Sequence, residues 1–286
     1  MLNNNDKNQK NQKNQNIKIA ECRESQNNKK IKELYEEISK KVDLPFGFCS
    51  IKNIGTPKIV RSKRGDFISA VLFLFPYKVK NERPKNISRY AAVPDYHNYI
   101  IPFLKEIATD LNIKFAPFNF KAYSDYTPVL EAKAAGFAGL GSIGKNGLLI
   151  NEKYGSFCFI GSILTDMDLP NSKSGLTYCN NCGLCLKNCP VNLNKEICVS
   201  DISQKKQDLT DSEIKLLKKA GSCFGCDICQ EVCPLNKNTK LTKISFFING
   251  YRDEYILNED SAGRAYNWRS EDIIKRNFKL LAKKTP

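Results

Sequence analysis

The sequence predicts an α+β fold in which a mixed α/β body, residues 29–170, precedes a cysteine-dense segment at 171–240. Apolar stretches at helical spacing and short runs of β-branched and aromatic residues are interspersed along the body. Nine of the 12 cysteines fall between residues 179 and 233. The 286 residues are 41% hydrophobic and 26% charged, which is typical of a globular protein with a substantial core.

The N-terminal residues 1–28 are rich in Asn, Lys and Gln, and they predict a disordered tail because they offer almost nothing to bury. A basic arm for nucleic acid is the alternative. A helix is expected from residue 29. Four residues fall on one stripe of it: Ile31, Leu34, Tyr35 and Ile38. No secretory signal or membrane span is evident, so we expect a cytoplasmic protein whose cysteines stay reduced.

The body is expected to contain helices and strands in mixed order. In sequence they are a strand at 66–77, a helix at 94–112, an extended segment at 114–123, a helix at 128–137, and strands at 147–150 and 155–166. The last two strands predict a hairpin. Residues 241–286 are expected to pack on the body and to end in a basic helix. Ile274, Phe278 and Leu281 share one face of that helix.

Two cysteine runs share one spacing, C-x2-C-x2-C-x3-C, and each is followed by proline. They comprise Cys179, Cys182, Cys185 and Cys189 before Pro190, and Cys223, Cys226, Cys229 and Cys233 before Pro234. This spacing is typical of bacterial ferredoxins, in which the fourth cysteine of each run binds the other cluster. It predicts a ferredoxin-like domain with two [4Fe–4S] clusters that pass single electrons. Zinc sites use separated pairs with longer gaps, and the absence of an export signal argues against disulfides.

One cluster ligand is ambiguous, because this region holds nine cysteines and two clusters need eight. Ferredoxin spacing alone favours Cys223, and Cys198 lies between the two runs. We expect Cys22, Cys49 and Cys158 to be free thiols.

The glycine-rich segment 139–146, GLGSIGKN, matches the dinucleotide-binding pattern and nearly matches the P-loop. Both motifs need a strand before and a helix after, whereas here a helix precedes and a strand follows. Asn146 also stands where a P-loop has Ser or Thr. We therefore reject both interpretations. The segment is either a flexible backbone that approaches a flat or anionic ligand, with Lys145 beside it, or a structural turn.

Several segments together resemble the epoxyqueuosine reductase family, whose members depend on cobalamin and iron–sulfur clusters and are related in fold to reductive dehalogenases. The segments are SRYA (88–91) with DYH (95–97), DYTPVLE (125–131), AGLGSIGKNGLLI (138–150), GSFCFIGSILTD (155–166) and the cysteine region 179–234. The resemblance covers residues 29–286. It implies a nitroreductase-like cobalamin-binding body, a double-cluster domain, and a short form without the HEAT-like extension of longer members.

The resemblance also implies residue roles. Asp125 occupies the position of the catalytic acid. Residues implied at the corrin are Arg89, Tyr90, His97, Gly139, Gly141, Gly144, Lys145 and Asn146. Implied cluster ligands are Cys179, Cys182, Cys185 and Cys233 for one cluster, and Cys189, Cys198, Cys226 and Cys229 for the other. Ser142 stands where the family usually has Trp, which bears on substrate identity.

The implied reaction reduces epoxyqueuosine to queuosine in tRNA, with electrons passing through two clusters to cobalamin. Asp125 would supply a proton, which requires a raised pKa. From sequence alone, Asp125 could instead be the N-cap of the helix that follows. His97 is expected in the pocket wall and not as a cobalt ligand, because Ile100 replaces the glycine of D-x-H-x-x-G. Alternatives are another substrate, or a ferredoxin-like carrier without cobalamin.

The net charge of +15 permits binding of the tRNA anticodon region, but nearly half of it lies in residues 1–30 and 271–286. Composition bias is the alternative, and no known RNA module is visible. The last helix could contact phosphates or simply cap the domain; its basic residues are Lys275, Arg276, Lys279, Lys283 and Lys284. A one-electron donor such as ferredoxin or flavodoxin is the other expected partner. We expect a monomer with no membrane contact.

Overall fold

The computed structural model describes residues 27–52, 54–57 and 65–282, which divide into two compact units, Met1–Asp43 and Leu44–Pro286. In the first unit residues 27–41 are helical. Leu34 and Ile38 are buried as expected, but Tyr35 is 53% exposed, so the apolar stripe is narrower than predicted. The predicted tail lies outside the described residues, apart from residues 27 and 28, which already belong to the helix.

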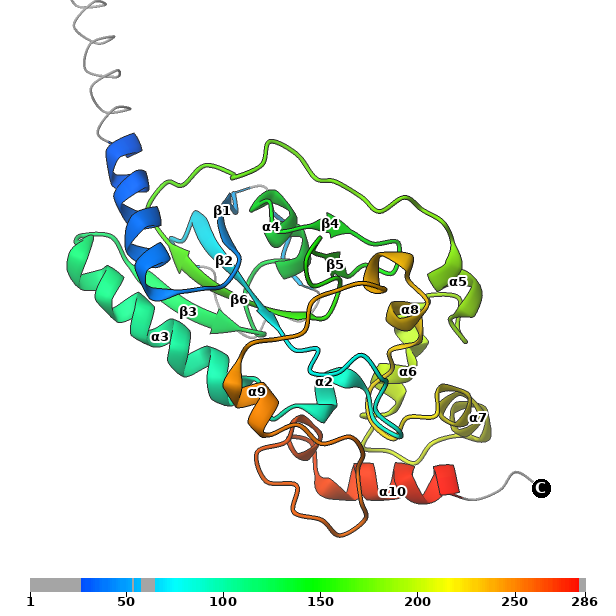
Figure 1. Ribbon diagram of the computed structural model, residues 1–286. Helices are drawn as coiled ribbons and strands as arrows, with labels where there is room; N and C mark the ends of the chain where they lie inside the picture. Colours follow the sequence, from blue (N-terminus) through cyan, green and yellow to red (C-terminus); the bar gives the residue numbers. More distant parts are fainter. Residues whose placement is uncertain (1–26, 53, 58–64, 283–286) are drawn as a thin grey trace, which may run out of the picture. The chain divides into compact units, whose positions relative to one another are not determined.

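The second unit is built on a four-stranded antiparallel sheet (Figure 1). Its strands are β1 (Phe46–Ser50), β2 (Ser69–Pro76), β3 (Phe120–Ser124) and β6 (Cys158–Thr165), in the order β1-β2-β6-β3. All eight residues of β2 are buried, as its continuous apolar sequence predicts for a strand covered on both faces. The strand expected at 66–77 is confirmed.

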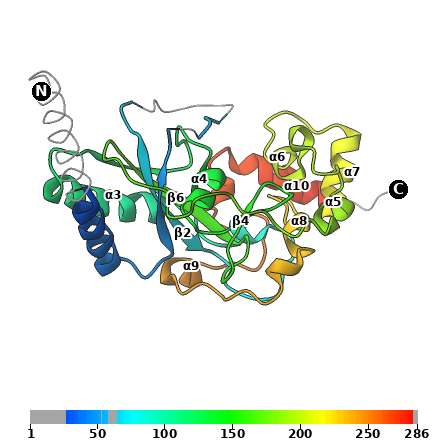
Figure 2. The same cartoon turned by 90° about the horizontal axis from the view of Figure 1, so that it is seen from above.

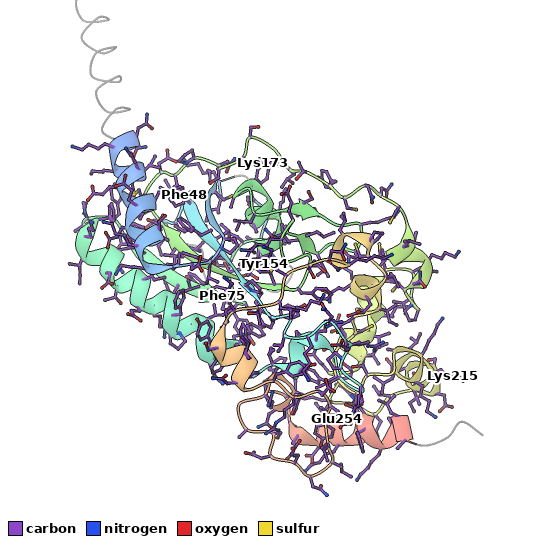
Figure 3. The ribbon with its side chains drawn as sticks, in the orientation of Figure 1. Phe48, Phe75, Tyr154, Lys173, Lys215 and Glu254 are labelled. Atoms are coloured by element: carbon purple, nitrogen blue, oxygen red, sulfur yellow. The ribbon has the colours of Figure 1, made fainter. Side chains whose placement is uncertain are left out.

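Helices cover both faces of this sheet. Successive side chains of a strand point to opposite faces, so alternate residues of one strand contact different helices. Ala70, Leu72 and Leu74 join a core cluster with α4 (Glu131–Phe137). On the opposite face, Phe75 packs edge-to-face against Tyr99 of α3 (His97–Lys114), with ring centroids 6.3 Å apart (Figure 3). The α3 helix was predicted at 94–112. The predicted helix at 128–137 begins later, at Glu131, because Pro128 and its neighbours form a turn.

The predicted hairpin of 147–150 with 155–166 is wrong. β5 (Leu149–Ile150) pairs with β4 (Ser142–Ile143) in a separate two-stranded sheet, whereas β6 enters the main sheet beside β2. Between β5 and β6 the chain makes a tight turn that is closed by an Asn151–Gly155 bridge. Apolar alternation identifies a strand but not its partner, and here the partner of β6 is an earlier strand.

Short helices make up the cysteine-dense region and gather at the end of this unit away from the sheet (Figures 1 and 2). They are α5 (Leu184–Asn188), α6 (Val199–Ile202), α7 (Asp211–Ala220) and α8 (Ile228–Glu231), joined there by α10 (Glu271–Ala282). The other short elements are α2 (Arg89–Ala92), α9 (Ser245–Asn249), and the 3-10 helices η1 (Lys195–Ile197), η2 (Pro234–Asn236) and η3 (Ala265–Asn267).

The C-terminal helix α10 packs through its predicted apolar face. Ile274 is fully buried, and Phe278 and Leu281 pack against the same cluster. The division into body, double-cluster domain and C-terminal segment stays a prediction, because Leu44–Pro286 is one compact unit. Among the described helices, none has the length and apolarity needed to cross a membrane.

Candidate functional site

A cavity of about 420 Å³ lies where the body, the cysteine-dense region and the C-terminal segment meet. Its lining residues come from segments far apart in sequence: Tyr90, Asp95, Tyr96, His97, Asp125, Tyr126, Gln204, Phe224, Ala265 and Trp268. Aromatic walls that enclose a few convergent polar groups are typical of a ligand site. The sequence singled out Tyr90, His97 and Asp125 but missed Tyr96, Tyr126, Gln204, Phe224 and Trp268. The available signals were that Tyr96 lies inside the DYH segment, that Tyr126 lies inside the DYTPVLE segment, and that Trp268 is the single tryptophan.

Asp125 stands in a strained turn directly after β3. Asp125 and Tyr126 have φ values of 53° and 42°, the left-handed region that non-glycine residues seldom adopt. Such residues cost about 1 kcal/mol each and are held by their surroundings, often at functional sites. The N-cap of α4 is Leu130, not Asp125, so the capping interpretation is wrong. The turn instead places the Asp125 carboxylate on the cavity wall.

Asp125 is linked to three polar side chains. Tyr96 and His97 lie at its Oδ2, and Asp95 lies on the other side of His97. The Tyr96 hydroxyl donates to Asp125 Oδ2. His97 Nε2 lies 3.2 Å from the same oxygen, within ion-pair distance although not aligned as a hydrogen bond. On its other side, His97 Nδ1 lies 2.8 Å from Asp95 Oδ1, and that oxygen also accepts from the His97 backbone N–H. The imidazole is therefore held between two carboxylates.

This arrangement favours a protonated imidazole. Burial, the largest effect, lowers the pKa of His97, but Asp125 and Asp95 together outweigh it and raise this pKa to about 9. Burial also raises the pKa of Asp95, yet the hydrogen bonds from His97 bring it below its ordinary value. Burial and the charge of Asp125 raise the pKa of Tyr96, so its hydroxyl stays a donor. At neutral pH the site holds a proton on His97, next to Asp125.

Glu131 adds a second acid on the far side of Asp125. A cavity of about 380 Å³ is bordered by Asp125, Tyr126, Glu131 and Trp268, among others. Oε1 of Glu131 is enclosed and has no hydrogen-bond partner. Burial, followed by the charge of Asp125, raises the pKa of Glu131 well above its ordinary value, while His97 opposes the shift. The raised pKa favours the protonated form of Glu131.

The cysteines fall into two interleaved sets. Cys233 of the second run lines one small cavity together with Cys179, Cys182 and Cys185, the first three cysteines of the first run. Cys198 lies close to Cys226, and Cys189 and Cys226 lie close to Cys229. Packing of α5 against α8 brings the two runs together. The fourth cysteine of each run thus stands with the other set, as the ferredoxin spacing predicts.

Cys223 stands apart from both sets. It is fully buried in an apolar cluster with Ile87, Ala91 and Tyr255, and burial raises its pKa to about 12. Tertiary packing therefore places Cys198, and not Cys223, beside the second set. Among the described residues no cysteine forms a disulfide, and this includes Cys49 and Cys158.

The two sets fit cubane clusters better than single ions. No three His, Cys, Asp or Glu side chains in the described ranges are grouped closely enough to hold one metal ion. A [4Fe–4S] cluster spaces its four thiolates more widely, because each binds a different iron. The soft, all-sulfur donor set suits iron–sulfur chemistry.

The glycine-rich segment lies against the first cysteine set and not in the 420 Å³ cavity. Gly144, Lys145 and Asn146 line the small cavity with Cys179 and Cys182. Gly139 and Gly141 do not border the larger cavity either. The segment forms the turn between β4 and β5, preceded by α4, so the structure agrees with the rejection of the dinucleotide and ATP motifs.

Arg89 and Ser142 also lie away from the larger cavity. Arg89 is 5% exposed, and its guanidinium binds Glu231 and the backbone oxygens of residues 80–82. It therefore ties α2 to α8. The Ser142 hydroxyl donates to Thr177, 3.0 Å away, and Ser142 lines neither cavity at Asp125.

Comparisons with known proteins agree with this geometry. A family model described as "Epoxyqueuosine reductase QueG, DUF1730" matches residues 65–126, and one described as a 4Fe-4S double cluster binding domain matches 178–236. An epoxyqueuosine reductase of Pseudomonas aeruginosa is 43% identical over 105 residues, which make up 36% of this chain and 29% of that protein. The aligned part of the chain thus spans less than a third of the length of this relative.

Solved structures share the fold. An epoxyqueuosine reductase of Bacillus subtilis, described with its catalytic aspartate loop swung out of the active site, has a TM-score of 0.71 at 21% identity. An epoxyqueuosine reductase bound to an epoxyqueuosine-modified tRNA-Tyr stem loop has a TM-score of 0.72 at 22% identity. Each match covers 87% of this chain and 80% of the other. The chain therefore carries an epoxyqueuosine reductase domain and a double-cluster domain on the fold of the solved epoxyqueuosine reductases, and it is related to that family.

Proposed function

We propose that the chain is an epoxyqueuosine reductase, which takes up two electrons and two protons to convert the epoxide of epoxyqueuosine in tRNA to an alkene and water. One observation carries the proposal: the Asp95–His97–Asp125 cluster faces a cavity that is also lined by residues of the cysteine-dense region, Gln204 and Phe224. Gln204 follows α6, which begins after Cys198, and Phe224 lies two residues before Cys226. A proton source and an electron route thus reach the same cavity.

The two cysteine sets would hold the two clusters. Cys182 is exposed, so the first set is the natural entry for a one-electron donor such as ferredoxin or flavodoxin. Phe224, two residues before Cys226, lines the cavity, so the second set would deliver electrons there. A reducing compartment such as the cytoplasm would keep these thiolates available.

The 420 Å³ cavity, together with the 380 Å³ cavity that shares Asp125, Tyr126 and Trp268 with it, is proposed as part of the cobalamin site. Its aromatic residues Tyr90, Tyr126, Phe224 and Trp268 offer flat apolar surface for a macrocycle. When bound, cobalamin would supply the strongly reducing chemistry that no side chain provides. His97 stands in the wall of this cavity, engaged by Asp95 and Asp125, and is therefore not offered as a cobalt ligand.

Asp125 is the proposed proton donor to the leaving oxygen. Its Oδ2 stands between the Tyr96 hydroxyl and His97 Nε2, so the proton held on the imidazolium can pass through Asp125 to the leaving oxygen. Asp95 keeps that imidazole oriented, because it accepts from both Nδ1 and the His97 backbone N–H. Glu131 is a second protonated group close to Asp125.

A basic groove next to the cavity suits the tRNA backbone. Asp201, Gln204, Lys205, Lys206, Gln207 and Arg269 line it, and Gln204 also lines the cavity. Arg269 lies 4.0 Å from the centroid of the Trp268 ring, which is 48% exposed. Cationic groups beside an exposed aromatic ring fit phosphates and an unstacked base.

The α10 helix is better explained as a cap than as an RNA contact. The Arg276 guanidinium donates to backbone oxygens of Lys205 and Gln207, and Lys275 pairs with Glu271. Lys279 is exposed, while Lys283 and Lys284 lie outside the described residues. The groove at Lys206 and Arg269 is therefore the proposed tRNA surface.

The test is turnover by the purified full chain. After anaerobic reconstitution with iron, sulfide and cobalamin, it is given a low-potential reductant and tRNA containing epoxyqueuosine, and the nucleosides are analysed by mass spectrometry. We expect queuosine from the parent chain and none from Asp125→Asn. A loaded enzyme that leaves epoxyqueuosine unchanged would indicate another substrate. A chain that binds clusters but shows no cobalamin spectrum would indicate an electron carrier.

A further inference from the structure

The first cysteine set reaches the surface of the protein through Cys182, the one exposed cysteine among the described residues. Three apolar side chains beside this set are exposed as well: Tyr178 is 68%, Leu184 38% and Leu235 42% exposed. Tyr178 directly precedes Cys179. Leu184 comes two residues after Cys182, and Leu235 lines the small cavity together with the cysteines. Apolar surface therefore surrounds the thiol through which the first proposed cluster would meet solvent.

The two segments that carry these residues contain no acidic side chain. One segment runs from residue 169 to 195 and the other from 232 to 250, and neither includes Asp or Glu. Their lysines are all exposed: Lys173, Lys187, Lys195, Lys237, Lys240 and Lys243. The surface near Cys182 is therefore built from segments whose side-chain charges are all positive.

Four lysines stand next to the first cysteine set. Lys145 is exposed and lines the small cavity. Lys195 reaches the same glycine-rich turn, since its Nζ lies 2.6 Å from where a Cβ of Gly147 would be. Lys187 lies on α5, between the third and fourth cysteines of the first run, and Lys237 directly follows η2. We define the entry surface as these residues with the three apolar ones: Lys145, Lys187, Lys195, Lys237, Tyr178, Leu184 and Leu235.

Apolar side chains within a basic rim fit a protein partner whose own surface is acidic. Protein interfaces commonly have an apolar centre and a polar rim, and opposite charges speed the encounter. Transient redox partners use small interfaces, which suits a patch of three apolar side chains. An RNA backbone fits less well, because neither segment contains arginine, the residue best shaped for phosphate. The basic groove at Lys206 also shares no lining residue with the small cavity.

We propose that the entry surface docks an acidic one-electron carrier protein, with its lysines steering the encounter and Leu184 and Leu235 packed at the centre of the contact. In the docked pair one electron passes from the reduced carrier to the oxidised first cluster. The carrier is oxidised, the cluster is reduced, and no bond forms or breaks. Two such encounters supply the two electrons of one turnover. The proposal rests on the clusters of the proposed function, but it does not depend on the substrate.

The experiment is anaerobic stopped-flow mixing of the reconstituted full chain with flavodoxin hydroquinone, an acidic one-electron carrier. Iron content is measured first, and bleaching of the cluster absorbance gives the second-order rate constant over a range of salt concentrations. The double variant Lys187→Gln, Lys237→Gln should lower this rate constant by about 10-fold at low salt. The parent chain and the variant should converge at high salt, because added ions screen the charges.

A matched control removes the same charge elsewhere. Lys105→Gln with Lys121→Gln changes exposed lysines on α3 and β3, which lie away from α5 (Figures 1 and 2), and should keep the parent rate constant and salt dependence. Photoreduced 5-deazariboflavin, a small uncharged reductant, should reduce the clusters of all these chains equally. Leu184→Ala should weaken the binding of oxidised flavodoxin severalfold and leave its salt dependence unchanged.

Equal rate constants for the entry-surface variant and the control would overturn the proposal. So would a variant that keeps its rate with flavodoxin but loses affinity for a tRNA anticodon stem loop, since the surface would then bind RNA. If the double variant loses iron, Lys187→Gln and Lys237→Gln alone supply the measurement. A loaded chain that shows the expected rates but leaves epoxyqueuosine unchanged would support the docking surface and refute the proposed substrate. A parent chain without two clusters would overturn both proposals, and the iron content reveals this before mixing.

Discussion

His97 Nε2 lies 3.2 Å from Asp125 Oδ2. This contact joins the only histidine of the sequence to the aspartate that the family resemblance implies as the catalytic acid. The two side chains come from different elements: His97 begins α3, and Asp125 follows β3. Neither the spacing of 28 residues between them nor any local pattern predicts the contact. Their proximity supports the proposed role of Asp125 in proton transfer.

Replacing Asp125 tests that relay. We expect Asp125→Asn to lower the turnover of epoxyqueuosine tRNA by about 100-fold or more, because general acid catalysis contributes at that scale. Cluster and cobalamin content should match the parent chain and be measured by absorbance. Asp66→Asn, an exposed residue away from the cavity, is the control and should keep full activity. Full activity of Asp125→Asn would exclude the catalytic role.

The raised pKa of His97 predicts a pH-dependent stability. Its folded-state pKa of about 9 exceeds the ordinary 6.5, so its contribution is complete below about pH 6.5 and is lost as pH rises through 9. After allowance for solvent screening of this partly exposed group, we expect about 1 to 2 kcal/mol. Urea unfolding of the parent chain and His97→Gln at pH 6 and pH 10 measures the difference. Equal gaps at both pH values would contradict the prediction.

The raised pKa of Glu131 predicts a second pH-dependent contribution to stability, which a matched variant can test. Its raised pKa means that the carboxyl stabilises the fold most at low pH and loses that contribution as pH rises above about 4.5. Glu131→Gln keeps the shape but cannot ionise. We expect the variant to gain stability relative to the parent chain as pH rises from 4 to 8. Parallel stability profiles for the two chains would show that Glu131 is not held protonated.

The two ambiguous cysteines give opposite expectations. Cys198→Ser should lose about half of the reconstituted iron, because it removes one ligand of the second cluster. Cys223→Ser should keep all of it, since Cys223 is buried among apolar side chains, although the polar hydroxyl should lower stability. Iron analysis and EPR of both variants decide the assignment. Retained iron in Cys198→Ser together with loss in Cys223→Ser would reverse it.

The basic groove predicts that Lys206 makes a salt-dependent contact with RNA. Lys206→Gln should weaken binding of a tRNA anticodon stem loop and reduce the slope of log K against log salt by about one. Lys215→Gln on α7 is the matched control, because the Lys215 side chain is exposed (Figure 3) and does not line the groove. Equal salt slopes for the two variants would place the RNA elsewhere.

Local patterns in the sequence determined the buried strand β2, the helices α3 and α10 and the two cysteine runs. Each depends on a short-range period or spacing that a single segment carries. The sequence also identified Asp125, Tyr90 and His97 as site candidates. It did not identify Trp268 or Gln204, since neither belongs to a motif and each reaches the cavity only through packing.

The sequence by itself determined which residues can do chemistry: eight thiolates in ferredoxin spacing, one histidine and one aspartate in a family motif. Only the tertiary structure decided how they are used. It buried Cys223 in an apolar cluster, left Cys198 beside Cys226, and placed the glycine-rich turn against Cys179. These outcomes depend on contacts between residues distant in sequence, and burial or exposure there fixes charge, ligation and pKa.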